Sequence, residues 1–235
     1  MFAIIAAGGS GSRMGQIGAP NKIFLPLRQN ITVLQCTIDS ILSANVCRGI
    51  CVVARLADIP TVNKIISSVP SDLEVVVVEG GVTRADSVKN GLNAIRGKAQ
   101  YVLIHDAARP LCPPELIRAV TERARVKQAA ILATPVRSTL KRSEDGEAVL
   151  RTVPREGMWE AQTPQAFLYS LLDEAYAAAG ERRAEATDDS QIVENFGHSV
   201  DIVPSTPLNF KITTTEDFAM AKQYTERRII FGNQY

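Results

Sequence analysis

Short apolar runs rich in β-branched residues alternate along this chain with segments whose apolar residues recur at helical spacing. A run of four to eight apolar residues is typical of a strand buried on both faces, and a recurrence every three to four residues is typical of a helix. The predicted strands cover residues 2–7, 50–54, 73–78, 101–104 and 130–133. The predicted helices cover residues 33–42, 62–68, 87–95 and 115–124. This alternation predicts an α/β fold, with a mostly parallel, twisted sheet flanked by helices on both faces.

The alternation breaks over residues 136–159, where polar and apolar residues follow one another singly. A Glu-Asp-Gly turn signal at residues 144–146 makes this stretch a predicted β-hairpin. Because it is so polar, we expect it to project from the body as an arm over about residues 136–158. Further predicted elements are a helix over 166–179, a short helix after Asp189, a strand over 198–203 and a final helix from Glu216. With no internal repeat or long linker, residues 1–235 are expected to form one domain.

Composition limits the partners that the chain can have. Its 235 residues are 46% hydrophobic and 22% charged, and the formal net charge is +1. Such a balance gives no support to a surface for nucleic acid or an anionic membrane, so we expect small anionic substrates met by local cations. No stretch reaches about 18 apolar residues, and no basic residue precedes the first apolar run, so neither a membrane span nor a secretion signal is expected. These features predict a cytoplasmic protein.

Four cysteines lie in mostly apolar stretches, with no Cys-x-x-Cys pair and no nearby histidine. Zinc sites require closely spaced ligands of these kinds, so a zinc site is not expected. We predict reduced, structural thiols of the kind found in cytosolic proteins. The residues concerned are Cys36, Cys47, Cys51 and Cys112.

A glycine-rich loop directly after the first predicted strand is the clearest chemical signal. Gly8 and Gly9 begin it, and Arg13 and Lys22 follow. Glycines let backbone amides approach an anion closely, because no Cβ intervenes. A dinucleotide-binding Gly-x-Gly-x-x-Gly would need glycine where Met14 stands, and no Gly-x-x-x-x-Gly-Lys followed by Ser or Thr can be placed. The loop therefore predicts nucleotide-phosphate binding of another kind, and it argues against a nicotinamide dehydrogenase.

Reactive groups in parallel α/β sheets gather at the carboxyl ends of the strands. Two glycines, the second of them Gly81, follow the third predicted strand and offer backbone to a flat or anionic ligand. The alternative is an ordinary turn with a helix cap at Thr83 or Asp86. Later in the chain, residues 161–167 and 187–189 are further candidates for the site, and each has an ordinary alternative: a proline turn for the first and a helix cap for the second.

The fourth predicted strand leads into Asp106 and Arg109, three residues apart. A carboxylate suits a divalent metal or a substrate hydroxyl, and a guanidinium suits a phosphate; the alternative is a local ion pair. We interpret His105 as a packed or hydrogen-bonded residue rather than a catalyst. Lys211 stands in an otherwise apolar run, where its ammonium must reach solvent or meet an anion, and we favour the anion.

Seven fragments in order, from Ala3 to about Asp217, resemble the 2-C-methyl-D-erythritol 4-phosphate cytidylyltransferases of isoprenoid biosynthesis. They are AAGGSGSRMG with the later lysine, GGVTRADSV with NGL, HDAARP, ATPVRSTLKR, AQTPQAF, TDDS and NFKIT. The resemblance implies a glycosyltransferase-A-like α/β fold and a homodimer formed by exchange of the hairpin arm. It also implies a reaction of CTP with methylerythritol phosphate, dependent on Mg²⁺ or another divalent cation, that gives the CDP-alcohol and pyrophosphate.

The resemblance further implies roles for individual residues. Arg13 and Lys22 match the pair that stabilises the transition state on the triphosphate. The implied nucleotide contacts are Ala6, Ala7, Gly8, Gly9, Gly81, Val82, Ser87 and Asp106, with Asp106 also the implied metal ligand. The implied substrate contacts are Arg109, Thr139, Arg155, Thr163 and Lys211. Thr139 and Arg155 belong to the arm, so the resemblance implies that they enter the neighbouring subunit's site.

The chain departs from the family pattern at two places. Asn21 precedes Lys22, where many relatives have proline, and Ile23 follows it, where many have glutamine. Val82 stands where some relatives have a polar side chain, which leaves only main-chain contact with the base at that position.

Two other functions stay open at this point. A cytidylyltransferase for another polyol phosphate, such as ribitol 5-phosphate, would share the nucleotide half of the site, although HDAARP, RADSV and TDD favour the methylerythritol enzyme. A non-catalytic nucleotide-binding module is the second. The presence of Arg13, Lys22, Asp106 and Lys211 speaks against it, because a sensor does not need to compensate transition-state charge.

Overall fold

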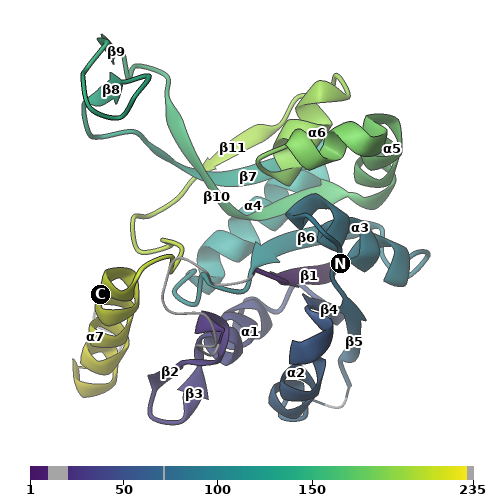
Figure 1. Ribbon diagram of the computed structural model, residues 1–235. Helices are drawn as coiled ribbons and strands as arrows, with labels where there is room; N and C mark the ends of the chain where they lie inside the picture. The colour runs from purple at the N-terminus through teal and green to yellow at the C-terminus, as the bar shows by residue number, and fades with distance from the viewer. Residues whose placement is uncertain (10–20, 71, 232–235) are drawn as a thin grey trace.

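The computed structural model describes residues 1–9, 21–70 and 72–231, and a seven-stranded sheet forms its centre (Figure 1). The strand order is β11-β7-β10-β6-β1-β4-β5. The strands are β1 (Phe2–Ala7), β4 (Gly49–Ala54), β5 (Glu74–Glu79), β6 (Tyr101–Asp106), β7 (Ala129–Pro135), β10 (Trp159–Leu168) and β11 (Asp201–Pro204). All neighbours pair in parallel except β10, which is antiparallel to both β6 and β7. The predicted mostly parallel α/β sheet is confirmed.

Helices cover both faces of this sheet (Figure 1). They are α1 (Val33–Ala44), α2 (Ile59–Ile66), α3 (Arg84–Ala94), α4 (Pro114–Lys127), α5 (Tyr169–Ala179), α6 (Asp189–Asn195) and α7 (Thr215–Phe231). The 3-10 helices are η2 (Lys22–Phe24), η3 (Leu56–Asp58) and η4 (Gly180–Glu185). A small hairpin, β2 (Pro26–Arg28) with β3 (Ile31–Thr32), leads into α1. Within the described residues, no helix is both long and apolar enough to cross a lipid bilayer.

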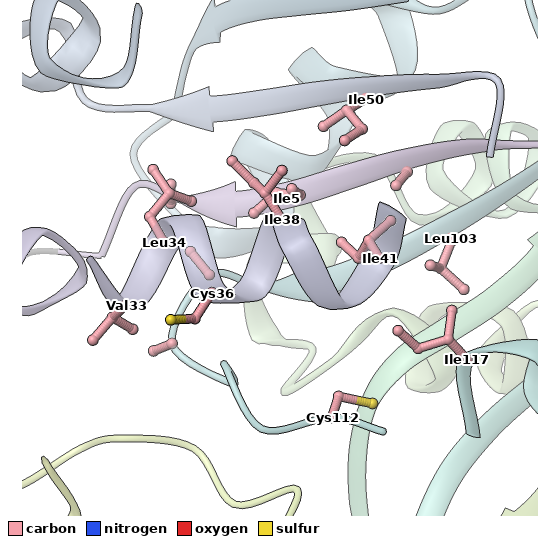
Figure 2. Close-up of a cluster of buried hydrophobic side chains, with 14 of the residues drawn as sticks. Ile5, Val33, Leu34, Cys36, Ile38, Ile41, Ile50, Leu103, Cys112 and Ile117 are labelled. Atoms are coloured by element: carbon pink, nitrogen blue, oxygen red, sulfur yellow. The ribbon is translucent and has the colours of Figure 1, made fainter. Parts of the chain in front are cut away.

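Two hydrophobic clusters, one on each face of the sheet, follow from the alternation of side chains along its strands. Ile5 of β1 packs in the cluster that contains Leu34 and Ile38 of α1, as Figure 2 shows. Its neighbour Ile4 belongs to the opposite cluster, which contains Leu92 of α3. Because β1 is buried on both faces, it is a nearly continuous apolar run, and this is why its bounds could be predicted to the residue.

The predicted hairpin is present and projects from the body as an arm (Figure 1). Its strands β8 (Leu140–Arg142) and β9 (Arg151–Val153) pair antiparallel with each other, in a sheet separate from the central one. Gly146, whose φ is +82°, stands in the turn, and its amide donates to Ser143 Oγ at 2.9 Å. The arm leaves the body between the end of β7 and the start of β10, so both of its ends are fixed by the central sheet.

The sequence prediction is wrong around β10. A helix is predicted from residue 166, and a proline turn is the ordinary alternative for residues 161–167, but β10 runs through this stretch into the middle of the sheet and α5 begins only at Tyr169. The strand signal is weak because the centre of β10 carries buried polar residues and Pro164, where the pairing register with β7 shifts. A polar strand of this kind escapes a search for apolar runs. β11 also begins at Asp201, three residues later than expected.

The four cysteines are free thiols, as predicted. Burial raises the pKa of Cys36 to about 11 and the pKa values of Cys51 and Cys112 to about 12. These three thiols are therefore protonated at neutral pH, and a protonated buried thiol is a poor nucleophile.

Candidate active site

A pocket of about 440 Å³ opens where β1, β5 and β6 end. Parallel strands end at the same edge of a sheet, so the loops that follow them converge there. The lining residues are Ala6, Ala7, Gly8, Gly9, Asn21, Lys22, Ile23, Gly81, Val82, Thr83, Arg84, Ser87, Asp106, Ala108 and Lys211. A second cavity of about 420 Å³, between α5, η4 and α6, is lined by none of the predicted site residues. We therefore take the first pocket as the candidate site.

The pocket brings together all eight residues predicted to contact the nucleotide, together with Lys22 and Lys211. Four other predicted site residues are not part of its lining: Arg109, Thr139, Arg155 and Thr163. Arg13 lies outside the described residues. Thr139 and Arg155 are exposed on the arm, so their predicted contact with substrate stays a prediction that requires a second copy of the chain.

Asn21 connects the glycine loop with Lys22. Its side-chain amide donates to the carbonyl of Gly9 at 3.1 Å and to Asp58 Oδ2 at 3.2 Å. Its Oδ1 accepts from the amide of Ile23 at 3.4 Å, which caps the 3-10 helix η2 that begins at Lys22. Asn21 is only 5% exposed, so these contacts are shielded from water. Asn21, one of the residues at which the chain departs from the pattern of the family that it resembles, thus links the segment at Lys22 to the glycine loop.

The second glycine segment is held by a capping box at the start of α3. Thr83 Oγ1 accepts from the amide of Asp86 at 3.0 Å, and Asp86 Oδ2 accepts from the amide of Thr83 at 3.1 Å. Ser87 Oγ accepts from the amide of Gly81 at 3.0 Å. A Cβ on Gly81 would lie 2.3 Å from Asp86 Cβ, so only glycine fits there. The side chain of Val82 is fully exposed. Gly81, Thr83 and Ser87 line the pocket, so the residues that cap α3 also form part of the pocket wall.

Asp106 is the carboxylate of the pocket, and cations surround it. Its Oδ2 lies 3.0 Å from Lys211 Nζ and 3.5 Å from Arg109 Nε, and its Oδ1 lies 3.5 Å from Arg84 Nε. Burial alone would raise the pKa of Asp106, but these cations hold that pKa well below its usual range. The carboxylate is therefore ionised. The prediction that Lys211 meets an anion is confirmed, and the anion is this carboxylate.

Thr163 lies behind Asp106 rather than in the pocket. Its hydroxyl accepts from the amide of Asp106 at 3.0 Å and lies 2.9 Å from His105 Nδ1. All three residues are buried, and burial lowers the pKa of His105 to about 3, so its imidazole is neutral. His105 is a hydrogen-bonded core residue, as predicted. Thr163 fixes the main chain that carries the carboxylate.

Arg109 is a buried link between two segments of the site. Its Nη1 donates to the carbonyl of Asn209 at 2.6 Å, and its Nε faces Asp106. Asn209 in turn donates to the carbonyl of Thr163 at 2.9 Å. Arg109 thus ties the end of β6 to the segment that carries Lys211. The ion pair between Asp106 and Arg109, which the sequence left open as an alternative, is present. Contact of Arg109 with the substrate stays a prediction.

Arg84 also belongs to this site, although the sequence did not predict it there. Arg84 lines the pocket, and its Nη2 lies 2.8 Å from Asp189 Oδ2. The available signal was its place directly after the predicted cap at a strand exit. Its partner Asp189 is 105 residues further along the chain, so no short sequence motif could predict that contact.

The described residues suit a divalent cation only if phosphates supply most of its ligands. They contain no group of three His, Cys, Asp or Glu side chains that could hold a metal ion. Of the described residues that line the pocket, Asp106 alone contributes a carboxylate, and cations already flank it. Mg²⁺ typically binds through one or two carboxylates together with substrate phosphates and waters. The donor set therefore fits an ion that enters with a triphosphate, and it does not fit a metal enclosed by protein.

Comparison with known proteins places the whole chain in one family. The chain matches the family model described as 2-C-methyl-D-erythritol 4-phosphate cytidylyltransferase over residues 1–227. It is 38% identical over 223 residues to the protein of that name from Prochlorococcus marinus (strain MIT 9313), which covers 94% of this chain and 96% of the relative. A second relative of the same name, from Alkaliphilus oremlandii (strain OhILAs), is 38% identical over 226 residues, with 96% of this chain and 94% of the relative covered.

Solved structures give the same result. The crystal structure of 4-diphosphocytidyl-2C-methyl-D-erythritol synthase from Anaerococcus prevotii matches with a TM-score of 0.80 at 32% identity, covering 96% of this chain and 98% of that one. The 2-C-methyl-D-erythritol 4-phosphate cytidylyltransferase from Thermus thermophilus matches with a TM-score of 0.76 at 32% identity, covering 95% and 98%. The resemblance seen in the sequence is confirmed: this chain belongs to the 2-C-methyl-D-erythritol 4-phosphate cytidylyltransferase family.

Proposed function

We propose that the pocket is where this cytidylyltransferase joins CTP to 2-C-methyl-D-erythritol 4-phosphate, in isoprenoid biosynthesis, and releases pyrophosphate. One observation carries the proposal: two glycine segments, Lys22, and the Lys211–Asp106 pair line a single pocket. The product is 4-CDP-2-C-methyl-D-erythritol. The relatives compared above carry the methylerythritol name, which favours this acceptor over ribitol 5-phosphate.

The reaction needs charge compensation more than a base. The acceptor is a phosphate monoester that is already anionic at neutral pH. One of its oxygens attacks the α-phosphorus of CTP in line, and the bond from that phosphorus to the bridging oxygen breaks as pyrophosphate leaves with the electron pair. Two anions must approach one another while charge builds on the leaving group. Positioning and preorganised positive charge therefore supply the rate.

Lys22 is assigned to the leaving group. It is held beside the glycine loop through Asn21, and a lysine is a compact charge on a mobile stem that can follow the charge onto pyrophosphate. Arg13 is assigned the complementary task of a planar clamp on the triphosphate oxygens. The main chain at Gly8, Gly9 and Gly81 is assigned to the phosphates and the base.

Asp106 is assigned to the metal. A divalent cation bound there, Mg²⁺ or another, would neutralise part of the triphosphate charge. The ammonium of Lys211 lies 3.0 Å from Oδ2 of the same carboxylate, so it would stand next to the metal. We assign Lys211 to the phosphate of the acceptor.

We also propose that the protein is a homodimer in which each arm completes the other subunit's site with Thr139 and Arg155. Two observations support the exchange. The arm is a two-stranded hairpin, and hairpins of this size are marginally stable alone. Exposed apolar side chains gather on the arm and at its base, as expected of a surface that another chain covers. They are Val149, Leu150, Met158 and Trp159.

The protein is further inferred to be cytoplasmic and to act on small molecules, without a nucleic-acid or membrane partner. Four free cysteines suit a reducing compartment, where thiols persist without forming disulfides. The net charge of +1 offers no extended basic surface to a polyanion.

Pyrophosphate release tests the function directly. The protein is incubated with CTP and Mg²⁺ and with methylerythritol phosphate, ribitol 5-phosphate or no acceptor. We expect release with methylerythritol phosphate and only background in the other two reactions. A higher kcat/KM for ribitol 5-phosphate would support a different polyol phosphate. Absence of release in all three reactions would support a non-catalytic nucleotide-binding module.

A further inference from the structure

One guanidinium in the pocket contacts carboxylates from two distant parts of the chain. Arg84 is the first residue of α3, directly after the N-cap Thr83, and its side chain is 29% exposed. Its Nη2 lies 2.8 Å from Asp189 Oδ2, and its Nε lies 3.5 Å from Asp106 Oδ1. Arginine presents a rigid planar fork, so the position of one edge determines the direction of the other.

The Asp189 edge of this fork is anchored in the core. Asp189 is the first residue of α6 and is fully buried. Its Oδ1 accepts from the hydroxyl of Tyr176 on α5 at 2.6 Å, and Tyr176 is only 1% exposed. Burial and the neighbouring carboxylate raise the pKa of Tyr176 well above its usual value, so the hydroxyl stays a donor. A buried carboxylate needs partners for both oxygens, and Arg84 and Tyr176 provide them.

The other edge acts on Asp106. Lys211 and Arg109 both approach Oδ2 of this carboxylate, Lys211 Nζ at 3.0 Å and Arg109 Nε at 3.5 Å. Arg84 is on the opposite oxygen, Oδ1. Each oxygen of the carboxylate therefore faces a cation, and loss of Arg84 would leave Oδ1 without its ion-pair partner while both cations on Oδ2 remain.

A purely structural role does not explain why a charged pair stands here. Replacing a buried ion pair by apolar side chains of similar volume is often neutral or stabilising, so a pair of this kind is weak evidence for stability alone. Arg84 also lines the pocket and pairs with its carboxylate, Asp106.

We propose that Arg84 is a positioning residue for cytidylyl transfer: anchored by Asp189 and Tyr176, it holds the carboxylate of Asp106 in its working orientation. The inference rests on the proposed function of the pocket. It adds to that function three residues, on α3, α5 and α6, two of which do not line the pocket at all.

The test compares Asp189→Asn and Tyr176→Phe with a matched control. The control is Asp173→Asn, which breaks the ion pair of Asp173 on α5 with Lys89 on α3 at 2.7 Å, outside the pocket lining. We expect Asp189→Asn to lower kcat by about 10-fold to 100-fold, the scale of a small misplacement near the reacting atoms. Tyr176→Phe should lower it by less. KM for CTP should change little in either, and Asp173→Asn should keep the kcat of the unmodified protein.

The decisive readout is the double variant Arg84→Ala with Asp189→Asn. If Asp189 acts through Arg84, the double variant turns over no more slowly than Arg84→Ala alone. Additive losses would overturn the proposal, because Asp189 would then act by another route. An unchanged kcat in Tyr176→Phe and Asp189→Asn would also overturn it, whether or not the Tm of these variants falls. If Asp189→Asn does not fold, Tyr176→Phe decides alone. Inactivity of the unmodified protein with every acceptor would overturn the proposed function first, and this inference with it.

Discussion

The side-chain amide of Asn21 donates to the carbonyl of Gly9 at 3.1 Å and so joins the exit of β1 to the turn that begins at Lys22. The same amide reaches Asp58 Oδ2 at 3.2 Å. Asp58 is itself held by Arg55, through Nε at 2.7 Å and Nη2 at 3.1 Å. One amide therefore ties together the loop after β1, the turn η2 and the turn η3 that follows β4.

Asn21→Ala is expected to lower kcat by about 10-fold, because a small displacement of Lys22 weakens its hold on the departing charge. The free energy of unfolding should fall by about 1 kcal/mol for the lost cap. Steady-state kinetics and urea denaturation measure both. In a background of Lys22→Ala, the added Asn21→Ala should cost no further activity. An additive loss would show that Asn21 acts through another residue.

Lys22→Ala is expected to lower kcat by about 100-fold or more, the scale of losing one preorganised donor to a developing anion. Binding of CTP, measured by calorimetry in the absence of the acceptor, should be largely intact. Lys127→Ala, at the exposed C-terminal end of α4, is the matched control and should keep full turnover. Near-normal turnover in Lys22→Ala would remove this residue from the mechanism.

The exchanged arm makes a prediction about mixed dimers. Subunits with Lys22→Ala are combined with subunits with Arg155→Ala, and heterodimers are isolated through two different tags. If each site takes its arm from the partner, one of the two sites has both residues intact, and up to about half of the full activity returns. Arg155→Ala alone should raise KM for methylerythritol phosphate. Heterodimers without recovered activity would mean that each chain builds its site alone.

Asp86 predicts a dependence of stability on pH. Hydrogen bonds from Thr83, and a contact of Arg183 Nε at 2.9 Å, hold the pKa of Asp86 below its usual value. A carboxyl with a lowered folded-state pKa stabilises the fold above its unfolded-state pKa, and this stabilisation is lost as the pH falls toward the folded-state pKa. The difference in unfolding free energy between the native protein and Asp86→Asn should be constant from about pH 7 to 5 and shrink below about pH 4. A difference that grows on acidification would contradict this assignment.

Most of the pocket could be predicted because its residues sit where apolar strands end. The strand runs that precede Gly8, Gly81 and Asp106 are buried or half-buried along their centres, and they are therefore clear in the sequence. Parallel strands end at one edge, so three exits far apart in the chain predict a single site. Lys211 stood out for a related reason, as a charge in an apolar run.

The parts that could not be predicted depend on contacts between polar residues distant in sequence. The centre of β10 is polar because its side chains bond to other segments: Gln165 donates to Asp188 at 2.8 Å, and Gln162 accepts from Asn209 at 2.9 Å. A hydrophobicity pattern does not register such pairs. The pairing of Arg84 with Asp189 was hidden for the same reason.

β10 connects two regions of the protein that would otherwise be separate. Trp159 at its start adjoins the arm, and Thr163, four residues on, holds the main chain of Asp106. At about 3.3 Å per residue, roughly 13 Å of strand separates these points. We expect substitutions in the arm and in the pocket to be coupled through this strand. A substitution that changes the path of the arm at this strand also moves the support of the carboxylate, so inherited changes in the two regions must be compatible with each other.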